Sequence, residues 1–333
     1  MTEAGMAPGA EISVVVVNYG TAELAIAGVE SVLARDHGGR RVDIHLVDNA
    51  SPGDDRAVLA ERCASPAWQG RVTFYPETEN HGFGRGHNLV FRALAARATP
   101  PDYVFLLNPD ARLENEAIAL LADFLDATPA AGFAGAGISK PDSGPVTAAF
   151  RFPGLVSEWV QTLGFGPVSR LFAGHRVALP PDHPRGPVGW VAGAAVMARL
   201  SMLRDLDYFD PAYFLYYEEV DLMRRASAAG WQIWYLPEAR VIHAEGAATG
   251  VRSHDAARPP RPAYWYQSWA HYYRAAKGPV GAAALALGVI VAAAGHQAQM
   301  RLRGKPSALP GRFIPDFWKV AARPLLQGRD PLA

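Results

Sequence analysis

The stretch "ISVVVVNY", residues 12–19, is an unbroken run of apolar, mostly β-branched side chains that ends in two polar residues. A strand with one face in water alternates apolar and polar residues, whereas an unbroken run indicates a strand that is covered on both faces. Strands of this kind belong to parallel sheets with helices on either side. The stretch therefore predicts a buried strand of an α/β fold.

The residues that follow continue this pattern. "TAELAIAGVESVLA" (21–34) has apolar residues at helical spacing. Further strands are expected at 42–51, 71–76 and 102–110, and further helices at 54–63, 86–98 and 115–127. Strand and helix alternate four times, which predicts an α/β sandwich with a mostly parallel central sheet. Residues 139–189 show little periodicity and are expected to be irregular, and regular structure resumes at 190–206 and 231–243.

Composition limits the classes of function. Half of the 333 residues are hydrophobic, which allows a large core, and the 32 basic and 32 acidic side chains balance, so we expect no nucleic-acid partner. The single cysteine, Cys63, excludes an internal disulfide and is typical of a reducing compartment. The first residues, "MTEAGMAPGAE", lack the basic and apolar regions of a signal peptide. We therefore expect a cytoplasmic protein.

The C-terminal section, residues 251–333, differs in charge, with 12 basic and 3 acidic side chains. Residues 278–295 carry no charge, at the lower length limit of a membrane span, but are rich in alanine and glycine, so a buried or interfacial helix is favoured over a span. "YWYQSWAHYYRAAKG" (264–278) interleaves aromatic and basic residues, which suits a helix in a bilayer interface. The alternative is a packing helix or a homodimer surface.

Polar clusters follow the predicted strands, where α/β sheets place their ligands. Asp48 and Asp110 end two of these strands. Asp48 could hydrogen-bond a nucleoside or simply cap the next helix. Asp110 would suit a cation that carries a diphosphate, although Asn-Pro-Asp is also a good turn sequence. His243 ends another apolar run. A single histidine there is more often structural, but with Asp110 it would form a mixed oxygen and nitrogen site for an ion such as manganese.

The loop "NHGFGRGHN" (80–88) concentrates three glycines ahead of a predicted helix. Glycine permits close backbone approach, and a helix start offers amide donors to an anion. The loop has neither the spacing of dinucleotide sites nor the ending of a P-loop. A tight strand-to-helix turn is therefore the alternative to a phosphate site.

The stretch "FLYYEEVDLMRR" (214–225) crowds three carboxylates, Glu218, Glu219 and Asp221, behind an aromatic run. Acids in the first turn of a helix complement its dipole, and Asp221 with Arg225 has the spacing of an ordinary ion pair. The alternative is that one carboxylate takes a proton from a substrate. Composition and spacing leave both interpretations open.

Seven segments in order resemble family 2 glycosyltransferases with the GT-A fold, particularly the bacterial rhamnosyltransferase-like branch. They span residues 12–250 and are "VVVVNYG", "LVDNAS", "NHGFGRGHN", "LLNPDAR", "WVAGAAVM", "FDPAYFLYYEEVDLMRRASAAG" and "LPEARVIHAEG". The resemblance implies a GT-A-type, Rossmann-like catalytic domain at 1–250, with a nucleotide-binding half at 11–138 and an acceptor half at 139–250. A helical tail, 251–333, would follow.

The resemblance also implies roles for individual residues. "NPD" would stand for the family's DxD motif, with Asn108 replacing its first acid, Asp110 binding Mn²⁺ or Mg²⁺, and His243 joining the metal. Glu219 would be the base of an inverting transfer. Glu218 and Asp221 would support it, and Trp190, Gly193 and Ala194 would face the donor sugar and acceptor. The expected nucleotide-sugar pocket comprises Asn18, Tyr19, Asp48, Asn80, Gly82, Phe83, Gly84, Asn88, Asn108 and Asp110.

The branch implies a dTDP- or UDP-sugar donor, with dTDP-rhamnose the leading candidate, and a glycan or polyprenyl-linked acceptor at the inner face of the cytoplasmic membrane. Two other classes compete with this interpretation. A nucleotidyltransferase would carry basic residues after its first strand, where this chain has "NYGTAELA". A non-catalytic sugar-nucleotide or glycan-binding module would not need the acids at 218–221.

Overall fold

A computed structural model describes residues 11–141, 144–244 and 259–332. The expected domain boundary after residue 250, the start of the chain and the last two residues of "VIHAEG" lie outside this part. The described chain forms two compact units. The first contains the residues up to Phe150, Leu179–Asp210 and 222–244, and the second contains Arg151–Ala178, Pro211–Asp221 and 259–332.

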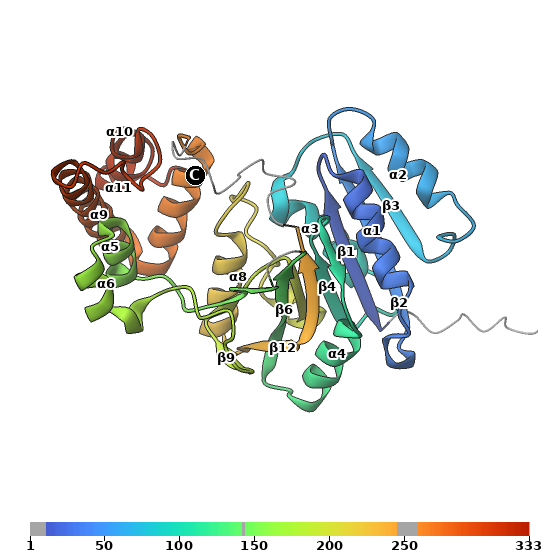
Figure 1. Cartoon of the computed structure of the whole chain (residues 1–333). Coiled ribbons are helices and arrows are strands. Elements are labelled where there is room, and N and C mark those ends of the chain that lie inside the picture. The colour runs from blue at the N-terminus through green and yellow to red at the C-terminus, as the bar shows by residue number, and fades with distance from the viewer. Residues whose placement is uncertain (1–10, 142–143, 245–258, 333) are drawn as a thin grey trace, which may run out of the picture. The chain divides into compact units, whose positions relative to one another are not determined.

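The first unit is built on a mostly parallel sheet (Figure 1). Its main strands have the order β3-β2-β1-β4-β11-β6-β12-β5. β1 pairs in parallel with β2 and β4, β12 pairs in parallel with β6, and β11 runs antiparallel between β4 and β6. The strands are β1 (Ile12–Asn18), β2 (Val42–Asn49), β3 (Val72–Glu77), β4 (Tyr103–Leu107), β5 (Ala111–Leu113), β6 (Ala131–Lys140), β7 (Gly144–Val146), β9 (Gly186–Val188), β11 (Ala195–Arg199) and β12 (Gln232–His243). A separate two-stranded ribbon joins β8 (Ala149–Phe150) to β10 (Trp190–Val191).

Helices cover both faces of this sheet, as the apolar run 12–19 predicts. Every residue of β1 is buried. Ile12, Val14 and Val16 face the helices α1 (Ala22–Leu33), α2 (Asp55–Cys63) and α4 (Ala117–Ala127). The next side chain along the strand, Val17, lies against α3 (Gly82–Ala95) on the other face. The prediction of an α/β sandwich is confirmed.

Shorter helices complete the first unit: η1 (His37–Gly39), α7 (Leu200–Asp205) and most of α8 (Glu218–Ala228). The second unit is helical, with α5 (Leu155–Leu163), α6 (Gly166–Leu171), η2 (Ala173–His175), α9 (Ala263–Leu302), α10 (Phe313–Phe317), the π-helical turn η3 (Trp318–Ala322) and α11 (Arg323–Leu326). The expectation of irregular structure throughout 139–189 is wrong for 155–171. α5 and α6 are nine and six residues long, too short for their periodicity to stand out.

A polar cluster on β1 and β2 gives the first unit a predictable response to acid. Burial alone would raise the pKa of Asp43, but hydrogen bonds from His45, Ser13 and Arg97 outweigh it and lower that pKa from 3.8 to about 2. A carboxyl group whose pKa is lower in the folded chain than in the unfolded chain stabilises the fold at pH values above the unfolded-state pKa. This stabilisation is lost as the pH falls through the folded-state pKa. Asp43 should therefore contribute about 2 kcal/mol at neutral pH, which is lost between about pH 4 and pH 2.

Urea unfolding of Asp43→Asn and of the parent chain from pH 6 downward would measure this contribution. The variant should be less stable at neutral pH and should lose less stability on acidification. Asp205→Asn, at an exposed acid on α7, serves as the control. Parallel pH profiles for the parent and Asp43→Asn would contradict the assignment.

Candidate functional site

The loop after β1 is organised by the buried side chain of Asn18. Its Oδ1 atom accepts hydrogen bonds from the backbone N–H and the hydroxyl of Thr21, at 3.2 and 2.8 Å. Its Nδ2 atom donates to Ser51 and Asp55, both at 3.1 Å. Asn18 therefore joins the loops after β1 and β2, whereas Tyr19 beside it is 40% exposed and available to a ligand.

Asp48 near the end of β2 has an unusual environment, because its side chain is fully buried. One carboxylate oxygen, Oδ2, accepts from Arg56 Nε at 3.3 Å, and the other, Oδ1, has no hydrogen-bond partner in the described part of the chain. Leaving a buried charged acceptor unpaired costs free energy. A donor on a ligand, such as a nucleoside hydroxyl or a base N–H, would satisfy it.

Asn49, which the sequence analysis did not single out, shapes the next loop. Its Nδ2 atom donates to Asn80 Oδ1 and to the carbonyl of Gly82, both at 3.1 Å, and its Oδ1 atom accepts from the backbone of His81 at 2.9 Å. Asn80 also accepts from the Gly82 N–H at 2.9 Å. The position of Asn49 beside Asp48 at a strand end was the available signal. The Asn49 side chain thus holds Asn80 next to β2, the strand that also carries Asp48.

The glycines of residues 80–88 serve packing in this structure. α3 begins at Gly82, four residues before the predicted start, and Gly82 has a φ of 73° that favours glycine. A Cβ atom on Gly84 would lie 2.9 Å from the Phe209 Cβ atom, and one on Gly86 would lie 2.9 Å from Val17 Cγ1. The ring of Phe83 packs on Phe209 as well. The strand-to-helix turn accounts for these glycines without a bound anion.

Asn88 is likewise engaged within the protein. Its Nδ2 atom donates to the Phe209 carbonyl at 2.8 Å, and its Oδ1 atom accepts from the Phe209 N–H at 3.0 Å. We expect Asn88→Ala to destabilise the first unit by about 2 to 4 kcal/mol, because two buried backbone groups lose their partner. Thermal and urea unfolding would measure this, with Leu89→Ala, at an exposed neighbour, as the control. Unchanged stability of Asn88→Ala would return Asn88 to the ligand-binding candidates.

The predicted strand 102–110 ends at Leu107, and Asp110 lies in a turn between β4 and β5, as the Asn-Pro-Asp sequence allows. The sheet brings Asp110 together with His243, which ends β12. Asp110 Oδ1 lies 2.9 Å from His243 Nε2, and Asn108 Nδ2 lies 3.2 Å from the same nitrogen. The Asp110 carbonyl also accepts from the Ala244 N–H at 3.0 Å, which fixes the end of β12 beside the loop after β4. Asp110 is nearly buried and His243 partly so. The pair thus lies at the carboxyl edge of the sheet.

A carboxylate and an imidazole suit a borderline divalent ion such as Mn²⁺. No third histidine, cysteine or acidic side chain forms a metal cluster with them among the described residues. The remaining coordination positions would be open to phosphate oxygens and water, as is usual where a metal binds together with a diphosphate. The pair therefore fits a metal that arrives with its substrate.

The segment "WVAGA" at 190–194 lies directly behind this loop. Trp190 stacks on Phe150 with ring centroids 4.0 Å apart, across the β8–β10 ribbon. Ala194 is buried, and its carbonyl accepts from the Asn108 N–H at 2.9 Å. The segment, with Gly193 inside it, therefore supports the backbone of the Asn-Pro-Asp loop.

The three acids of "FLYYEEVD" belong to the second unit and open α8. Tyr216 and Tyr217 directly before them have φ angles of 71° and 70°. This left-handed backbone conformation is unfavourable for residues other than glycine. Glu218 is 4% exposed and Glu219 is partly exposed. Strained backbone of this kind persists only where its surroundings hold it, and it is common at functional sites.

Burial raises the pKa of Glu218 well above its ordinary range, and the charge of Glu219 adds to this effect. Burial also raises the pKa of Glu219. A raised pKa suits a general base, and burial is the cause for Glu219. Both carboxylates are thus more basic than in water.

Aromatic side chains of α9 hold the strained turn. The Tyr217 ring lies 5.3 Å from Tyr272 and 6.0 Å from Trp265, and the Leu215 carbonyl accepts from the Ser268 hydroxyl at 3.0 Å. Glu158 of α5 accepts from Trp269 and Tyr273, at 3.2 and 2.8 Å. The most buried rings, Tyr266, Trp269, Tyr272 and Tyr273, are at most 1% exposed.

The interfacial interpretation of 264–278 is therefore wrong, and the packing alternative is confirmed. The sequence shows aromatic and basic residues interleaved, but helical spacing collects the aromatic rings on the face that the second unit covers.

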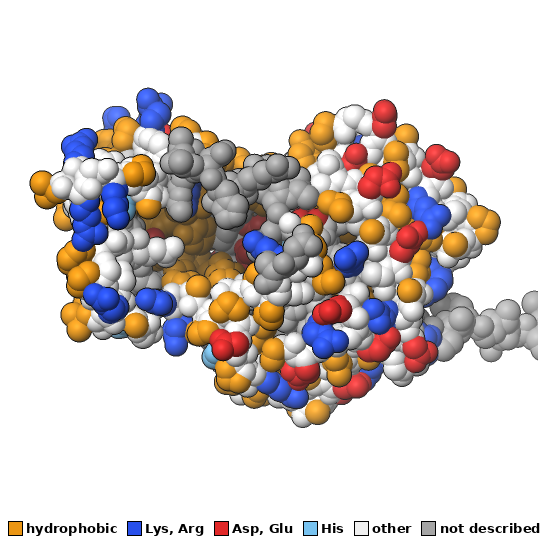
Figure 2. Space-filling model, in the orientation of Figure 1, with side chains coloured by type: hydrophobic (Ala, Val, Ile, Leu, Met, Phe, Trp, Pro, Cys, Tyr) orange, Lys and Arg blue, Asp and Glu red, His pale blue; other side chains and the backbone are white. Residues whose placement is uncertain are grey.

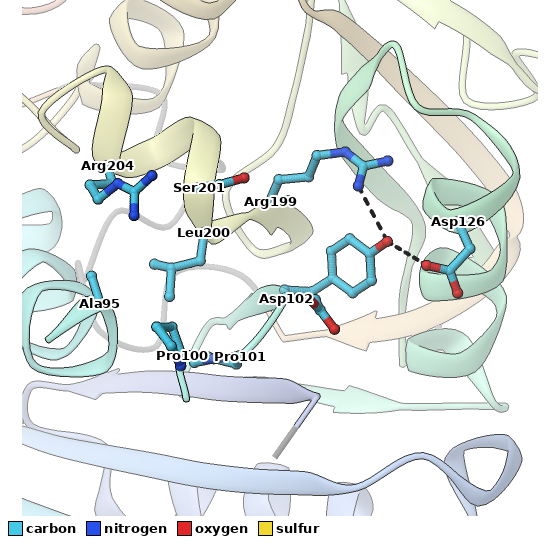
Figure 3. Close-up of a pocket in the computed structure, with 10 residues that line it drawn as sticks. Ala95, Pro100, Pro101, Asp102, Asp126, Arg199, Leu200, Ser201 and Arg204 are labelled. Atoms are coloured by element: carbon cyan, nitrogen blue, oxygen red, sulfur yellow. Dashed lines mark hydrogen bonds between the residues drawn. The ribbon is translucent and has the colours of Figure 1, made fainter. Parts of the chain in front are cut away.

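One cavity of the first unit, of about 420 Å³, lies away from these residues, at the amino end of β4 (Figure 3). Arg199 there donates to Tyr103 OH at 3.4 Å and to the Leu125 carbonyl at 2.6 Å, and Tyr103 donates to Asp126 at 2.5 Å. Burial is the main cause that raises the pKa of Tyr103, to about 12. These polar groups bind one another, so we assign them a structural role.

The chain is similar in sequence to known proteins. Residues 13–155 match the model of the glycosyl transferase family 2. An N-acetylglucosaminyl-diphospho-decaprenol L-rhamnosyltransferase of Mycobacterium tuberculosis is 31% identical over 219 residues, which cover 63% of this chain and 69% of that protein. The rhamnosyltransferase WbbL of Escherichia coli K12 is 24% identical over 169 residues, which cover 49% of this chain and 61% of that protein.

Solved structures share the fold at low sequence identity. A mannosyltransferase from Pyrobaculum calidifontis, in complex with GDP-Man and Mn²⁺, has a TM-score of 0.54 and 15% identity over 98% of this chain and 84% of its own. GalNAc-T7 with UDP, GalNAc and Mn²⁺ has a TM-score of 0.58 and 14% identity over 97% of this chain and 59% of its own. The fold is thus of the GT-A type. Together with the relatives above, it shows that the chain is a glycosyltransferase and belongs to glycosyl transferase family 2.

Proposed function

We propose that the protein transfers L-rhamnose from dTDP-rhamnose, with inversion, to a hydroxyl group of a polyprenyl-linked saccharide in cell-envelope polysaccharide synthesis. The observation that carries the proposal is the Asp110–His243 pair, which lies at the same sheet edge as Asp48 and its unpaired carboxylate oxygen. Asp110 and His243 at this edge would hold a metal for the diphosphate, and the Asp48 carboxylate would accept a hydrogen bond from the nucleoside. The choice of rhamnose and of a lipid-linked acceptor rests on the relatives.

The donor would lie along the carboxyl ends of β1, β2 and β4. Asp48 would accept from the nucleoside, with Asn18, Tyr19 and Asn80 around it. Asp110 and His243 would hold Mn²⁺ or Mg²⁺, which supplies positive charge for the departing diphosphate. Asn108 would orient His243, and Trp190, Gly193 and Ala194 would border the sugar and the acceptor. Gly84 and Asn88 are left out of this set because their packing with Phe209 accounts for them.

Glu219 would act as the base. Its carboxylate takes the proton of the acceptor hydroxyl while that oxygen forms a bond to the anomeric carbon of the donor. The bond from this carbon to the diphosphate breaks, and the nucleoside diphosphate leaves with the electron pair. A single displacement inverts the configuration of the anomeric carbon. Glu218 and Asp221 would support Glu219 or bind the acceptor.

The enzyme would work in the cytoplasm, at the inner face of the cytoplasmic membrane, because an acceptor on a polyprenyl carrier would lie in that membrane. The acceptor lipid is then a membrane component, so only the donor and the metal are taken from solution. A homodimer is compatible with this location but is not required by the reaction.

Calorimetric titration of dTDP in the presence of Mn²⁺ tests the donor side. We expect dTDP to bind, and Asp48→Asn to weaken it about tenfold or more, the scale of a lost hydrogen bond to a charged group. Asp54→Asn, at an exposed acid close in sequence, is the control. Equal dTDP affinity of Asp48→Asn and the parent chain would remove Asp48 from the pocket.

A further inference from the structure

The 40-residue helix α9 consists of two parts that differ in their surroundings. Gly278, with φ 71° and ψ 170°, interrupts the helix just before Pro279. The part before the break carries the buried aromatic rings that hold Tyr217. The part after it, 279–302, carries the uncharged stretch, and α9 is the one helix of the described chain that is long and apolar enough to cross a membrane.

The second part of α9 is apolar on both of its sides. Its inner side packs within the second unit, where Ala282, Leu285, Val289 and Ala293 are at most 3% exposed. Its outer side carries the apolar stripe, which consists of Val280, Ala284, Leu287, Val291 and Ala294. These residues recur at intervals of four and three, and all are exposed, Val280 by 82% and Val291 by 68%. A helix with one side in water normally has polar residues there.

Basic side chains follow this stripe along the chain, at the end of α9 and just after it. Arg301, Arg303 and Lys305 are exposed, and Leu302 between them is 91% exposed. Residues 259–332 contain ten basic and two acidic side chains. On the visible face of this unit, Lys and Arg side chains gather with hydrophobic side chains between them (Figure 2). The surface thus combines apolar area with positive charge.

We infer that the apolar stripe and the basic group Arg301, Arg303 and Lys305 form a docking surface for an anionic lipid bilayer. Apolar area with lysine and arginine nearby is the combination that holds helices in the plane of an anionic bilayer interface. A second copy of the chain would bring the same positive charge to the contact and would be repelled. This inference rests on the proposed function and deepens it, because it identifies the surface that would contact the membrane in which a lipid-linked acceptor lies.

The helix would lie on the bilayer and not cross it. Length does not decide this, since the helix is long and apolar enough to cross a membrane, but the exposed apolar stripe from Val280 to Ala294 covers only one of its sides. The inner side of the helix is also occupied by the protein itself. Only the outer side is free to enter the lipid.

Sedimentation of the full chain with phosphatidylglycerol–phosphatidylcholine vesicles, without donor or acceptor, tests this inference. The parent chain should bind these vesicles and should be partly released by salt. Arg301→Gln/Arg303→Gln/Lys305→Gln should bind about 100-fold more weakly, because each basic side chain contributes about fivefold at an anionic surface. Leu287→Glu/Val291→Glu should abolish binding, whereas Leu89→Glu, at a 36% exposed leucine on α3, should not affect it.

Other outcomes would overturn the inference. Binding that resists both salt and alkaline extraction would indicate a span. Self-association in sedimentation velocity that is lost in Leu287→Glu/Val291→Glu, without vesicle binding by the parent, would indicate a second copy as the partner. Thermal unfolding shows whether each variant is folded. Vesicle binding without any sugar transfer would support the docking surface and refute the proposed function. Sugar transfer to a water-soluble acceptor without vesicle binding would support the transfer reaction and refute the docking surface.

Discussion

Replacement of Glu219 by glutamine should lower turnover by about 10²-fold or more, the scale of a lost general base, while the donor binds as before. The amide keeps the size and shape of the side chain but cannot take the acceptor proton. Initial rates at saturating donor and acceptor, together with calorimetric donor titration, separate the two effects. The expected result is a large loss in kcat with little change in donor affinity.

The pH dependence gives this prediction a second readout. A base must be deprotonated to act, so the raised pKa of Glu219 should move the acidic limb of the rate profile above the ordinary range of a glutamate. Glu219→Gln should remove that limb from the residual activity. Glu218→Gln is the matched comparison, because it changes the same group one position earlier. Near-normal transfer by folded Glu219→Gln would contradict the assignment and point to Glu218 or Asp221.

Loss of metal should have an equally large effect. Chelation should abolish transfer, and Mn²⁺ or Mg²⁺ should restore it, because Asp110 and His243 provide the protein's share of the metal ligands in this proposal. Asp110→Ala should lose metal-dependent binding of dTDP, which is measurable by calorimetry without turnover. Electron paramagnetic resonance of Mn²⁺ in the presence of dTDP should show the ion released to solution in this variant.

Asp205→Ala, at an exposed acid of the same unit, should bind Mn²⁺ and dTDP as the parent chain does. His243→Ala should weaken the metal-dependent part of binding less than Asp110→Ala, since it removes a neutral ligand. Full activity in chelator would refute the metal site, and basic side chains would then have to neutralise the diphosphate.

Most of the sheet was predictable because its strands are apolar throughout. The run around Val14 and Val16 needs cover on both faces, and the polar residues that end each strand must meet at one edge, so Asp48, Asp110 and His243 could be located before the structure. The pairing of Asp110 with His243 depends on β12 lying near the loop after β4, which no spacing in the sequence specifies. Asn49 was missed because its contacts are all with another loop.

The helical unit was harder to predict, because its order comes from contacts between distant segments. Trp269 and Tyr273 bind Glu158 more than 100 residues away, so their burial leaves no local pattern. The left-handed backbone of Tyr216 and Tyr217 is also invisible in composition, since glycine is the usual residue in that conformation. The acids that follow them could nevertheless be singled out from the sequence, because three carboxylates fall within four positions.

Mass spectrometry of the reaction product tests the central claim most directly. The full chain would be incubated with Mn²⁺, a polyprenyl-diphosphate acceptor analogue carrying N-acetylglucosamine, and one sugar nucleotide at a time. We expect dTDP-rhamnose to add one deoxyhexose to the acceptor, with the anomeric configuration inverted relative to the donor and with dTDP released. Transfer of no sugar from any donor, or formation of pyrophosphate from a nucleoside triphosphate and a sugar phosphate instead, would contradict it.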